Sequence, residues 1–314
     1  MRVIDLFCGC GGLSYGFQKE GFEIVAAYDN WQKAVAVYND NFTHKAILQD
    51  VTILESDSVK VLNPDLIIGG PPCQDYSSAG KRDESLGRAN LTLVFAQLVC
   101  NVKPKWFVME NVDRIVKSTT LPKALKKYKE AGYGLTQIVL DASHCGVPQK
   151  RKRFFLIGEL GGKDDFLKRA LIVHQSPNSM SIFDYLGNEF GTEYYYRHPR
   201  SYFRRGIFSI HEPSPTIRGV NRPIPPSYKI KSNDATSDLS KVKVLSTEER
   251  FRIQTFPKDF KLSGSKTDLE QIVGNAVPVE LAAYVARILK EYIDGQSLGI
   301  IPLADLSELP LFAV

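Results

Sequence analysis

A thiol stands directly after two prolines in the stretch DLIIGGPPCQDYSS, which covers residues 65–78. Consecutive prolines cannot continue a strand or lie inside a helix, so the chain must turn here and leave Cys73 little backbone freedom. An isolated cysteine is more often a small buried residue than a reactive one. The residues that follow, however, are polar and basic and include Ser77, Lys81 and Arg82. Cys73 therefore begins a polar loop, where a thiolate near positive charge can act as a nucleophile.

A carboxylate and two arginines elsewhere in the chain are suited to assist such a thiol. Glu110 comes directly after the apolar run WFVM, an unusual place for a structural acid, and beside a thiol it can donate or share a proton. The basic run QKRKR covers residues 149–153. Lysines in such a run are normally solvated, but Arg151 and Arg153 alternate along an expected strand and so share one face. We expect both arginines to point into the same site.

A glycine-rich turn near the N-terminus offers a second kind of chemistry. Gly9, Gly11 and Gly12 separate an apolar strand from a helix, and such a turn lets the backbone approach a ligand beside free N–H groups. Asp29 ends the next strand, where an acid can accept hydrogen bonds from ribose hydroxyls. Asp50 ends the third strand and can bind an exocyclic amine. The turn departs from G-x-G-x-x-G and is by itself often structural, but the two acids favour a nucleoside site.

Short apolar strands alternate with helices through the first half of the chain. The expected strands are RVIDLF, EIVAAYD, KAILQD, DLIIGG, WFVMENV, GLTQIVLDA and RFFLIGEL. This alternation is typical of an α/β fold in which helices cover both faces of a mostly parallel sheet. Ligands bind beyond the carboxyl ends of the strands in such sheets, and the candidate residues fall at those ends.

The alternation breaks after about residue 170 and partly returns after residue 242, where Ser246-x-x-Glu249 resembles a capping box. We expect residues 1–170 and 243–314 to form one domain and residues 171–242 a smaller, irregular, β-rich one. The insert interleaves tyrosines with arginines, which bind guanine edges and phosphates. A tyrosine- and arginine-rich surface without a ligand is the alternative. The arginines of interest are Arg204, Arg205, Arg218 and Arg222.

Composition limits the class of protein. The chain has 314 residues and a net charge of +5, which permits a polyanionic partner without establishing one. Its five cysteines are odd in number and form no C-x-x-C pair, so neither a disulfide framework nor a zinc site is expected. No signal-peptide layout and no membrane-spanning apolar run occur. We therefore expect a reducing, cytoplasmic setting and no membrane association.

Five motifs in a fixed order make the sequence similar to a known family. DLFCGCGGLSYGF, GGPPCQDYSS, ENV, QKRKR and GNAVP closely resemble the DNA (cytosine-5)-methyltransferase family, of the bacterial restriction–modification type. The match covers almost the whole chain except residues 171–242, where the family carries its variable target-recognition region. The resemblance implies a Rossmann-like S-adenosylmethionine-dependent methyltransferase fold with a small, irregular, β-rich target-recognition domain.

The resemblance also implies roles for individual residues. Cys73 would be the nucleophile, Glu110 would meet N3 and the amino group of cytosine, and Arg153, with Arg151 behind it, would hold the ring oxygen O2. The S-adenosylmethionine site would consist of Phe7, Gly9, Gly11, Gly12, Asp29, Asn30, Asp50, Val51, Gly70, Pro72, Leu91, Asn275 and Ala276. DNA would be contacted by Gln74, Ser77, Lys81, Arg82, Arg204, Arg205, Thr216, Arg218 and Arg222. No metal is implied.

By this resemblance the protein transfers a methyl group from S-adenosylmethionine to carbon 5 of a flipped-out cytosine in a short duplex DNA site, leaving S-adenosylhomocysteine. The reaction would pass through a covalent bond between Cys73 and carbon 6 of the base. We expect a bacterial, nucleoid-associated, cytoplasmic monomer that protects DNA from a restriction endonuclease acting on the same site. The sequence does not reveal which site that is.

Three other functions compete with this one. The same chemistry on a structured RNA is the nearest, although the sizeable insert favours DNA. A non-catalytic DNA- or cofactor-binding module is the second, and the presence of Cys73, Glu110 and Arg153 argues against it. An oxidoreductase or an amino-methyltransferase is the third, because the PPC and ENV motifs have no use in the former and the latter expects an aromatic residue where Cys73 stands.

Overall fold

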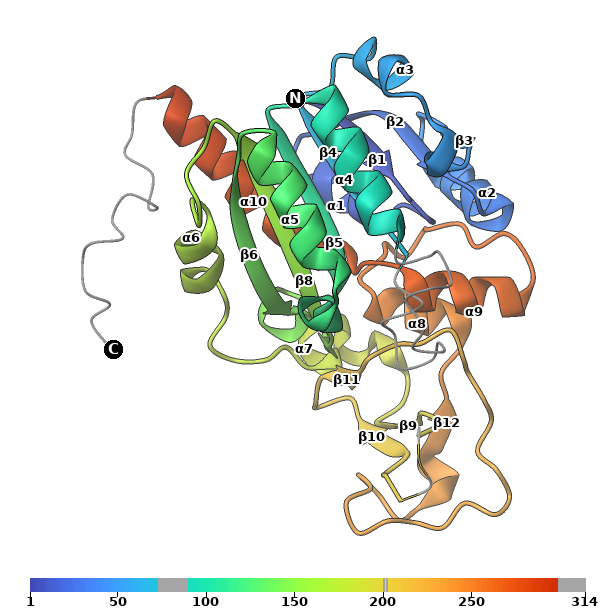
Figure 1. Cartoon of the computed structure of the whole chain (residues 1–314). Coiled ribbons are helices and arrows are strands. Elements are labelled where there is room, and N and C mark those ends of the chain that lie inside the picture. Colours follow the sequence, from blue (N-terminus) through green and yellow to red (C-terminus); the bar gives the residue numbers. More distant parts are fainter. Residues whose placement is uncertain (73–89, 200, 202, 299–314) are drawn as a thin grey trace. The chain divides into compact units, whose positions relative to one another are not determined.

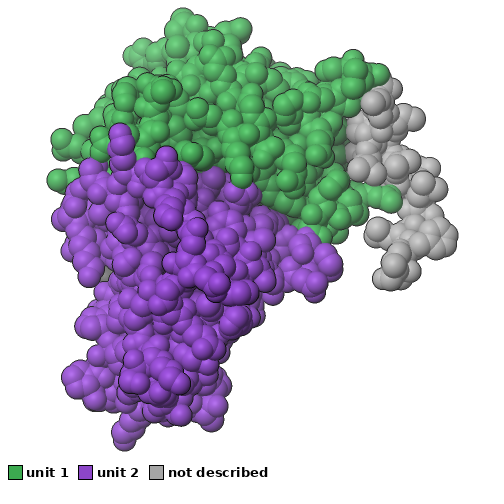
Figure 2. All heavy atoms as spheres, turned by 180° about the vertical axis from the view of Figure 1, so that it is seen from behind, with its two compact units in different colours: residues 1–140, 152–175, 282–314 green, residues 141–151, 176–281 purple. Residues whose placement is uncertain are grey.

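A computed structural model of the chain describes residues 1–72, 90–199, 201 and 203–298. The chain divides into two compact units, coloured green and purple in Figure 2. The first unit comprises residues 1–140, 152–175 and 282–314, and the second comprises residues 141–151 and 176–281. The second unit thus contains residues 176–242 of the predicted insert together with residues 141–151 and 243–281. The functional domain boundaries at residues 170 and 242 stay a prediction.

A seven-stranded sheet with the order β3-β2-β1-β4-β5-β8-β6 forms the centre of the first unit. Its strands are β1 (Arg2–Leu6), β2 (Glu23–Asp29), β3 (Ala46–Leu48), β4 (Leu66–Gly69), β5 (Trp106–Val112), β6 (Tyr133–Asp141) and β8 (Lys152–Leu160). The pairs from β3 to β5 are all parallel, whereas β8 runs antiparallel to β5. The predicted α/β class with a mostly parallel sheet is confirmed.

Helices cover both faces of this sheet, with α4 and α5 over one face and α1 and α10 over the other (Figure 1). The helices of the unit are α1 (Gly12–Lys19), α2 (Gln32–Asn41), α3 (Ser56–Lys60), α4 (Asn90–Val102), α5 (Thr120–Glu130), α6 (Lys168–Val173) and α10 (Val279–Ser297), the last beginning in the second unit. In β1, Ile4 and Leu6 join the apolar core beneath α4 and α5. Asp5 points to the opposite face, because side chains alternate along a strand.

The second unit is built from shorter elements. A three-stranded sheet contains β10 (Ile207–Ser209), β9 (Tyr194–Tyr196) and β12 (Val242–Val244), and β11 (Ser214–Pro215) pairs with β7 (Gln149–Lys150). Its helices are α7 (Ile182–Leu186), α8 (Thr247–Ile253) and α9 (Lys266–Asn275). The expected capping box begins α8, where Ser246 and Glu249 bond each other's backbone N–H groups. The insert is irregular, as predicted, and its strands are only two or three residues long.

One helical stretch, Lys266–Ser297, is long and apolar enough to cross a membrane by length and composition alone. Of its most apolar window, 72% is buried inside the protein. A core helix has this composition because it packs on all sides, so packing accounts for the apolar character of this stretch.

Gly158 in β8 is required by the packing of the core. A Cβ atom at this position would lie 2.0 Å from the ring of Phe107, which cannot move aside because it stacks on Tyr128 at 4.2 Å and meets Tyr133 edge-on. We expect Gly158→Ala to lower the free energy of unfolding by about 1–3 kcal/mol, as overpacking does. Urea unfolding followed by circular dichroism measures this change.

Gly295→Ala is the matched control. Gly295 lies in α10, and a Cβ atom there would meet nothing within 4 Å. This substitution should raise stability by about 0.5–1 kcal/mol, because alanine loses less backbone entropy than glycine in a helix. Equal effects of the two substitutions would contradict the packing argument.

Candidate active site

The carboxyl edge of the sheet brings several predicted site residues into one row. In the strand register, Leu6 lies opposite both Tyr28 and Gly69, and Gly69 lies opposite Met109. The residues that directly follow Leu6, Tyr28, Gly69 and Met109 are Phe7, Asp29, Gly70 and Glu110, respectively. Parallel pairing thus places the glycine turn, the ribose-binding candidate and the candidate acid side by side, as the sequence predicted.

The turn after β1 is held in a conformation that most residues avoid. Phe7, Gly9 and Gly11 have φ values of 62°, 56° and 94°, in the left-handed region. Such strain in a non-glycine residue is typical of ligand-binding turns. A Cβ atom at Gly9 would meet nothing within 4 Å, whereas one at Gly11 would lie 2.4 Å from the ring of Phe42. Gly9 therefore leaves open space at the start of α1, and Gly11 allows close packing behind the turn.

Two carboxylates flank this turn. Asp29 accepts hydrogen bonds from the backbone N–H groups of Gly9 and Trp31, both at 2.8 Å, and burial nevertheless raises its pKa. Asp50 accepts from the N–H and hydroxyl groups of Thr52, which lower its pKa, as does the side chain of Asn30. Each carboxylate keeps further lone pairs for a ligand. Val51 is buried beside Asp50, and Leu91 is half-buried in the first turn of α4. This donor and acceptor set fits a nucleoside.

Beneath the turn lies a buried polar chain that the sequence analysis missed. The hydroxyl of Ser14 in α1 donates to Asp5 at 2.6 Å, and the Tyr38 hydroxyl donates to Ser14 at 2.8 Å. Tyr38 also lies 2.7 Å from Nε2 of His44. Asp5 is fully buried, and desolvation raises its pKa to about 7. An acidic residue inside an otherwise apolar strand was the signal in the sequence.

Glu110 and Arg153 form an ion pair in the first unit. The Nε atom of Arg153 in β8 lies 2.8 Å from Oε1 of Glu110 in β5, and Glu110 is only 8% exposed. A Cβ atom at Gly70 would lie 3.2 Å from Oε2 of Glu110, so the glycine keeps the chain close to the carboxylate. Sequence reasoning placed Glu110 and Arg153 among the catalytic residues and Gly70 in the cofactor pocket, and the structure brings the three together.

The turn that leads to the thiol is tied to the same strand. Asn111 directly follows Glu110 in the sequence. Its Nδ2 donates to the carbonyl of Pro71 at 3.2 Å. Pro71 is buried and Pro72 is exposed. The amide of Asn111 therefore fixes the double-proline turn beside Glu110, a role the ENV motif did not reveal. Predicted residues outside the described part of the chain are Cys73, Gln74, Ser77, Lys81 and Arg82.

Arg151 has different partners from Arg153. It is 1% exposed and donates to the carbonyls of Ile217, Gly274 and Ala276 at 2.9–3.0 Å, all within the second unit. Residue 151 lies between β7 and β8, so the two arginines do not belong to one continuous strand. We expected both to share a face, and this break removes the reason for that expectation.

Gln149 completes the attachment of the Ile217 segment. Its Oε1 accepts from the N–H of Ile217 at 2.9 Å, and its Nε2 donates to Gln254. The Thr216 hydroxyl donates to the carbonyl of Lys150 at 2.8 Å. Gln149 and Arg151 thus hold the N–H and the carbonyl of Ile217, which lies 68 and 66 positions further along the chain, respectively.

A family model described as C-5 cytosine-specific DNA methylase matches residues 1–291 of the chain. The chain belongs to this family. The Type II methyltransferase M.HindV of Haemophilus influenzae is 58% identical over 92% of this chain and 96% of that protein. The Type II methyltransferase M.HgiDI of Herpetosiphon aurantiacus is 52% identical over 96% of this chain and 99% of that protein.

Solved structures agree on the fold of this C-5 cytosine methylase. The S. pombe Dnmt2 methyltransferase has a TM-score of 0.69 at 17% identity and covers 94% of this chain and 99% of its own. The Entamoeba histolytica methyltransferase EhMeth has a TM-score of 0.72 at 19% identity, with coverages of 93% and 98%. The fold is the Rossmann-like methyltransferase fold. The chain is a DNA methyltransferase of the Type II restriction–modification kind, whose family uses S-adenosylmethionine and methylates cytosine at carbon 5.

The predicted DNA-contacting residues of this methylase have varied surroundings in the second unit. Arg205 pairs with Glu212 and lies over the ring of Phe208, and Arg218 donates to the carbonyl of His198 at 2.5 Å. Arg204 and Arg222 are exposed. The DNA contacts of these arginines and of Thr216 stay predictions.

Asn275 is exposed and Ala276 half-buried, both in the second unit, and their place in the cofactor site also stays a prediction. Among the described residues, no group of three His, Cys, Asp or Glu side chains is placed to hold a metal ion.

The raised pKa of Asp5 predicts a pH-dependent stability. Because its pKa is about 7 when folded against 3.8 as a reference, the folded state binds more protons between these values. The contribution of Asp5 to the free energy of unfolding is therefore largest below pH 3.8. It falls by at most ~1.4 kcal/mol per pH unit as the pH rises to about 7. We expect Asp5→Asn to be more stabilising, or less destabilising, at pH 8 than at pH 5.

Urea unfolding of wild type and Asp5→Asn at several pH values measures this difference. Asp259→Asn removes an exposed carboxylate and serves as the control, with an equal effect expected at every pH. A constant difference between wild type and Asp5→Asn across this range would refute the assignment.

Proposed function

We propose that this methylase transfers the methyl group to a cytosine that has left the DNA stack, through a covalent bond between Cys73 and carbon 6. The observation that carries the proposal is the Glu110–Arg153 pair next to a double-proline turn held by Asn111. A buried acid, a paired guanidinium and a rigid turn one residue before a cysteine match the needs of this reaction better than those of a binding module.

The reaction divides among three side chains. The thiolate of Cys73 adds to carbon 6 of the cytosine, and the electron pair of the ring moves toward N3. Glu110 shares a proton with N3 and accepts from the exocyclic amine, so negative charge does not build up on the ring. Arg153 orients Glu110 and donates to O2. After methylation, loss of the carbon 5 proton expels the thiol and restores the aromatic ring.

S-adenosylmethionine supplies the methyl group on a sulfonium, which is electrophilic enough for carbon 5 to attack, and leaves as S-adenosylhomocysteine. Asp29 would accept the ribose hydroxyls, and Asp50, with Asn30 and Val51, would face the adenine. The open space at Gly9 lets the ligand approach the backbone at the start of α1. These residues fit the cofactor that the family uses.

Protection of host DNA against an endonuclease that cleaves the same site is the proposed role, since the similar proteins are named Type II methyltransferases. We also propose that the enzyme works in the bacterial cytoplasm on duplex DNA, as a monomer. Labelled methyl groups should enter duplex DNA and not tRNA, which separates DNA methylation from the same chemistry on RNA.

The covalent step is tested with DNA that carries 5-fluorocytosine at the target. Bisulfite sequencing of plasmid from expressing cells first identifies the site. Wild type should then give a complex with the fluorinated duplex that survives denaturation, because fluorine cannot leave carbon 5. Cys73→Ala should give none, and Glu110→Gln should slow methylation about 10²–10⁴-fold. Methylation of ordinary DNA without a trapped complex would exclude the mechanism.

A matched pair of substitutions tests the different roles of the two arginines. Arg153→Lys should lower kcat about 10²-fold with little loss of stability, because lysine lacks the planar fork that orients Glu110. Arg151→Lys should lower the free energy of unfolding by about 1–3 kcal/mol, because buried carbonyls lose donors. Its kcat should stay close to wild type where the protein is folded.

Thermal unfolding and initial rates at saturating substrate measure the two effects. If Arg151→Lys were as inactive as Arg153→Lys at full stability, Arg151 would contact the substrate instead of positioning the Ile217 segment.

A further inference from the structure

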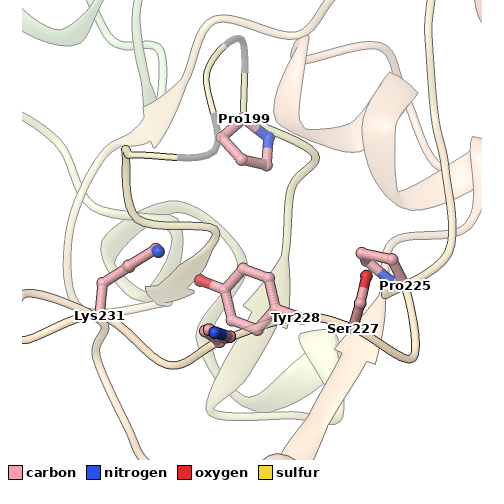
Figure 3. A pocket seen from close by; sticks show the side chains of 6 residues that line it. Pro199, Pro225, Ser227, Tyr228 and Lys231 are labelled. Carbon is pink, nitrogen blue, oxygen red and sulfur yellow. The ribbon is translucent and has the colours of Figure 1, made fainter.

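A pocket of about 230 Å³ lies in the second unit (Figure 3). It is lined by Pro199, Pro225, Ser227, Tyr228, Lys229 and Lys231. Pro199 belongs to the connection between β9 and β10, and the others belong to the stretch between residues 225 and 231. In Figure 3 the ring of Tyr228 stands between Lys231 on one side and Pro225 with Ser227 on the other.

The wall formed by Tyr228 is fixed by Asp234. Both carboxylate oxygens of Asp234 lie within 2.9 Å of the Tyr228 hydroxyl, which donates to them. The same carboxylate accepts from the N–H groups of Gly206, Ile207 and Lys231 at 2.7–3.0 Å. A single carboxylate therefore fastens the 225–231 stretch to the start of β10 and orders the pocket before a ligand arrives.

Close backbone packing strengthens this arrangement. The N–H of Gly206 also donates to the Tyr228 hydroxyl at 2.8 Å, and Tyr196 packs edge-on against the Tyr228 ring at 5.4 Å. A Cβ atom at Gly206 would lie 2.7 Å from the Tyr196 ring. Only glycine fits there, and its N–H group can therefore approach and bind the Tyr228 hydroxyl.

The chemistry of the lining favours an anion. Lys229 is exposed and Lys231 is half-buried, and they contribute two ammonium groups to the lining. The negative charge of Asp234 is occupied by four donors. The two prolines carry no N–H group. The Tyr228 hydroxyl is committed to Asp234, which leaves the Ser227 hydroxyl as the remaining uncharged polar group among the described side chains of the lining. The residues of the lining that the structure describes thus offer few fixed donors and acceptors with which to distinguish base edges.

We infer that this pocket binds a backbone phosphate of the duplex and positions the DNA without reading its sequence. Lysine is a point charge that suits a phosphate, whereas bidentate reading of guanine is typical of arginine. Phosphate contacts fix the register of a protein on DNA and carry no direct sequence information. The inference rests on the proposed function only in that the second unit contacts duplex DNA.

The double substitution Lys229→Ala and Lys231→Ala tests the inference by DNA binding instead of methylation. Fluorescence anisotropy with a labelled duplex gives the binding constant at several salt concentrations. The slope of log Kobs against log [salt] should become shallower by about 1–2, since each lost phosphate contact removes about one unit. Affinity should fall equally for the target duplex and for a duplex with one base pair of the site changed.

Two further variants make the result specific. Lys229→Arg with Lys231→Arg should restore the wild-type slope, because arginine also binds phosphate. Lys258→Ala with Lys261→Ala removes two exposed lysines of the same unit outside the pocket and should leave the slope unchanged.

Three outcomes would overturn the inference: an unchanged slope, an equal change in the Lys258/Lys261 control, or a changed preference between the two duplexes, which would indicate base reading. Failure of the proposed function is separate, because it would show as wild-type protein that traps no fluorinated duplex.

Discussion

The buried guanidinium of Arg151 is the interaction on which the second unit depends. Three carbonyls, from Ile217, Gly274 and Ala276, accept its hydrogen bonds, and these residues come from segments distant in the sequence. A guanidinium can satisfy several acceptors at once because its donors lie in one rigid plane. Removing it would take this donor from the carbonyls of Ile217 and Gly274, whereas the Ala276 carbonyl would still accept from Gln254. Gln149 extends the same arrangement, since it accepts a hydrogen bond from the N–H of Ile217 and donates one to Gln254.

The first unit relies on a different constraint, the parallel register of its central strands. Because Leu6, Tyr28, Gly69 and Met109 are aligned, the residues that follow them meet at one edge of the sheet. The polar groups at this edge are expensive to bury, and each has a partner that reduces the cost. Asp29 accepts backbone N–H groups, Glu110 pairs with Arg153, and Asp5 below the turn bonds Ser14. These contacts hold the described residues of the site in place.

Sequence patterns predicted the features that depend on neighbouring residues. The alternation of strands and helices, the glycine turn and the capping box at Ser246 follow from local periodicity and turn chemistry. Long-range partners have no such signal. The rule that alternate residues share a face holds only within one strand, and the break between β7 and β8 at residue 151 separates Arg151 from Arg153. Likewise, nothing in the ENV motif showed that Asn111 would bind the carbonyl of Pro71.

The cations of the second unit divide into two groups with different physical roles. Arg205 pairs with Glu212, and Arg250 pairs with Glu270 and donates to the carbonyl of Arg218, so these guanidinium groups stabilise the protein itself. Lys229, which is exposed, and Lys231, which is half-buried, line a pocket in which Asp234 holds Tyr228 in place. A charge that is already paired adds little attraction for a phosphate, whereas an exposed ammonium on a rigid wall keeps its full attraction. Affinity for the DNA backbone and recognition of its bases can therefore reside in different loops of one small unit. A protein built this way can change its base-reading residues without losing its hold on DNA.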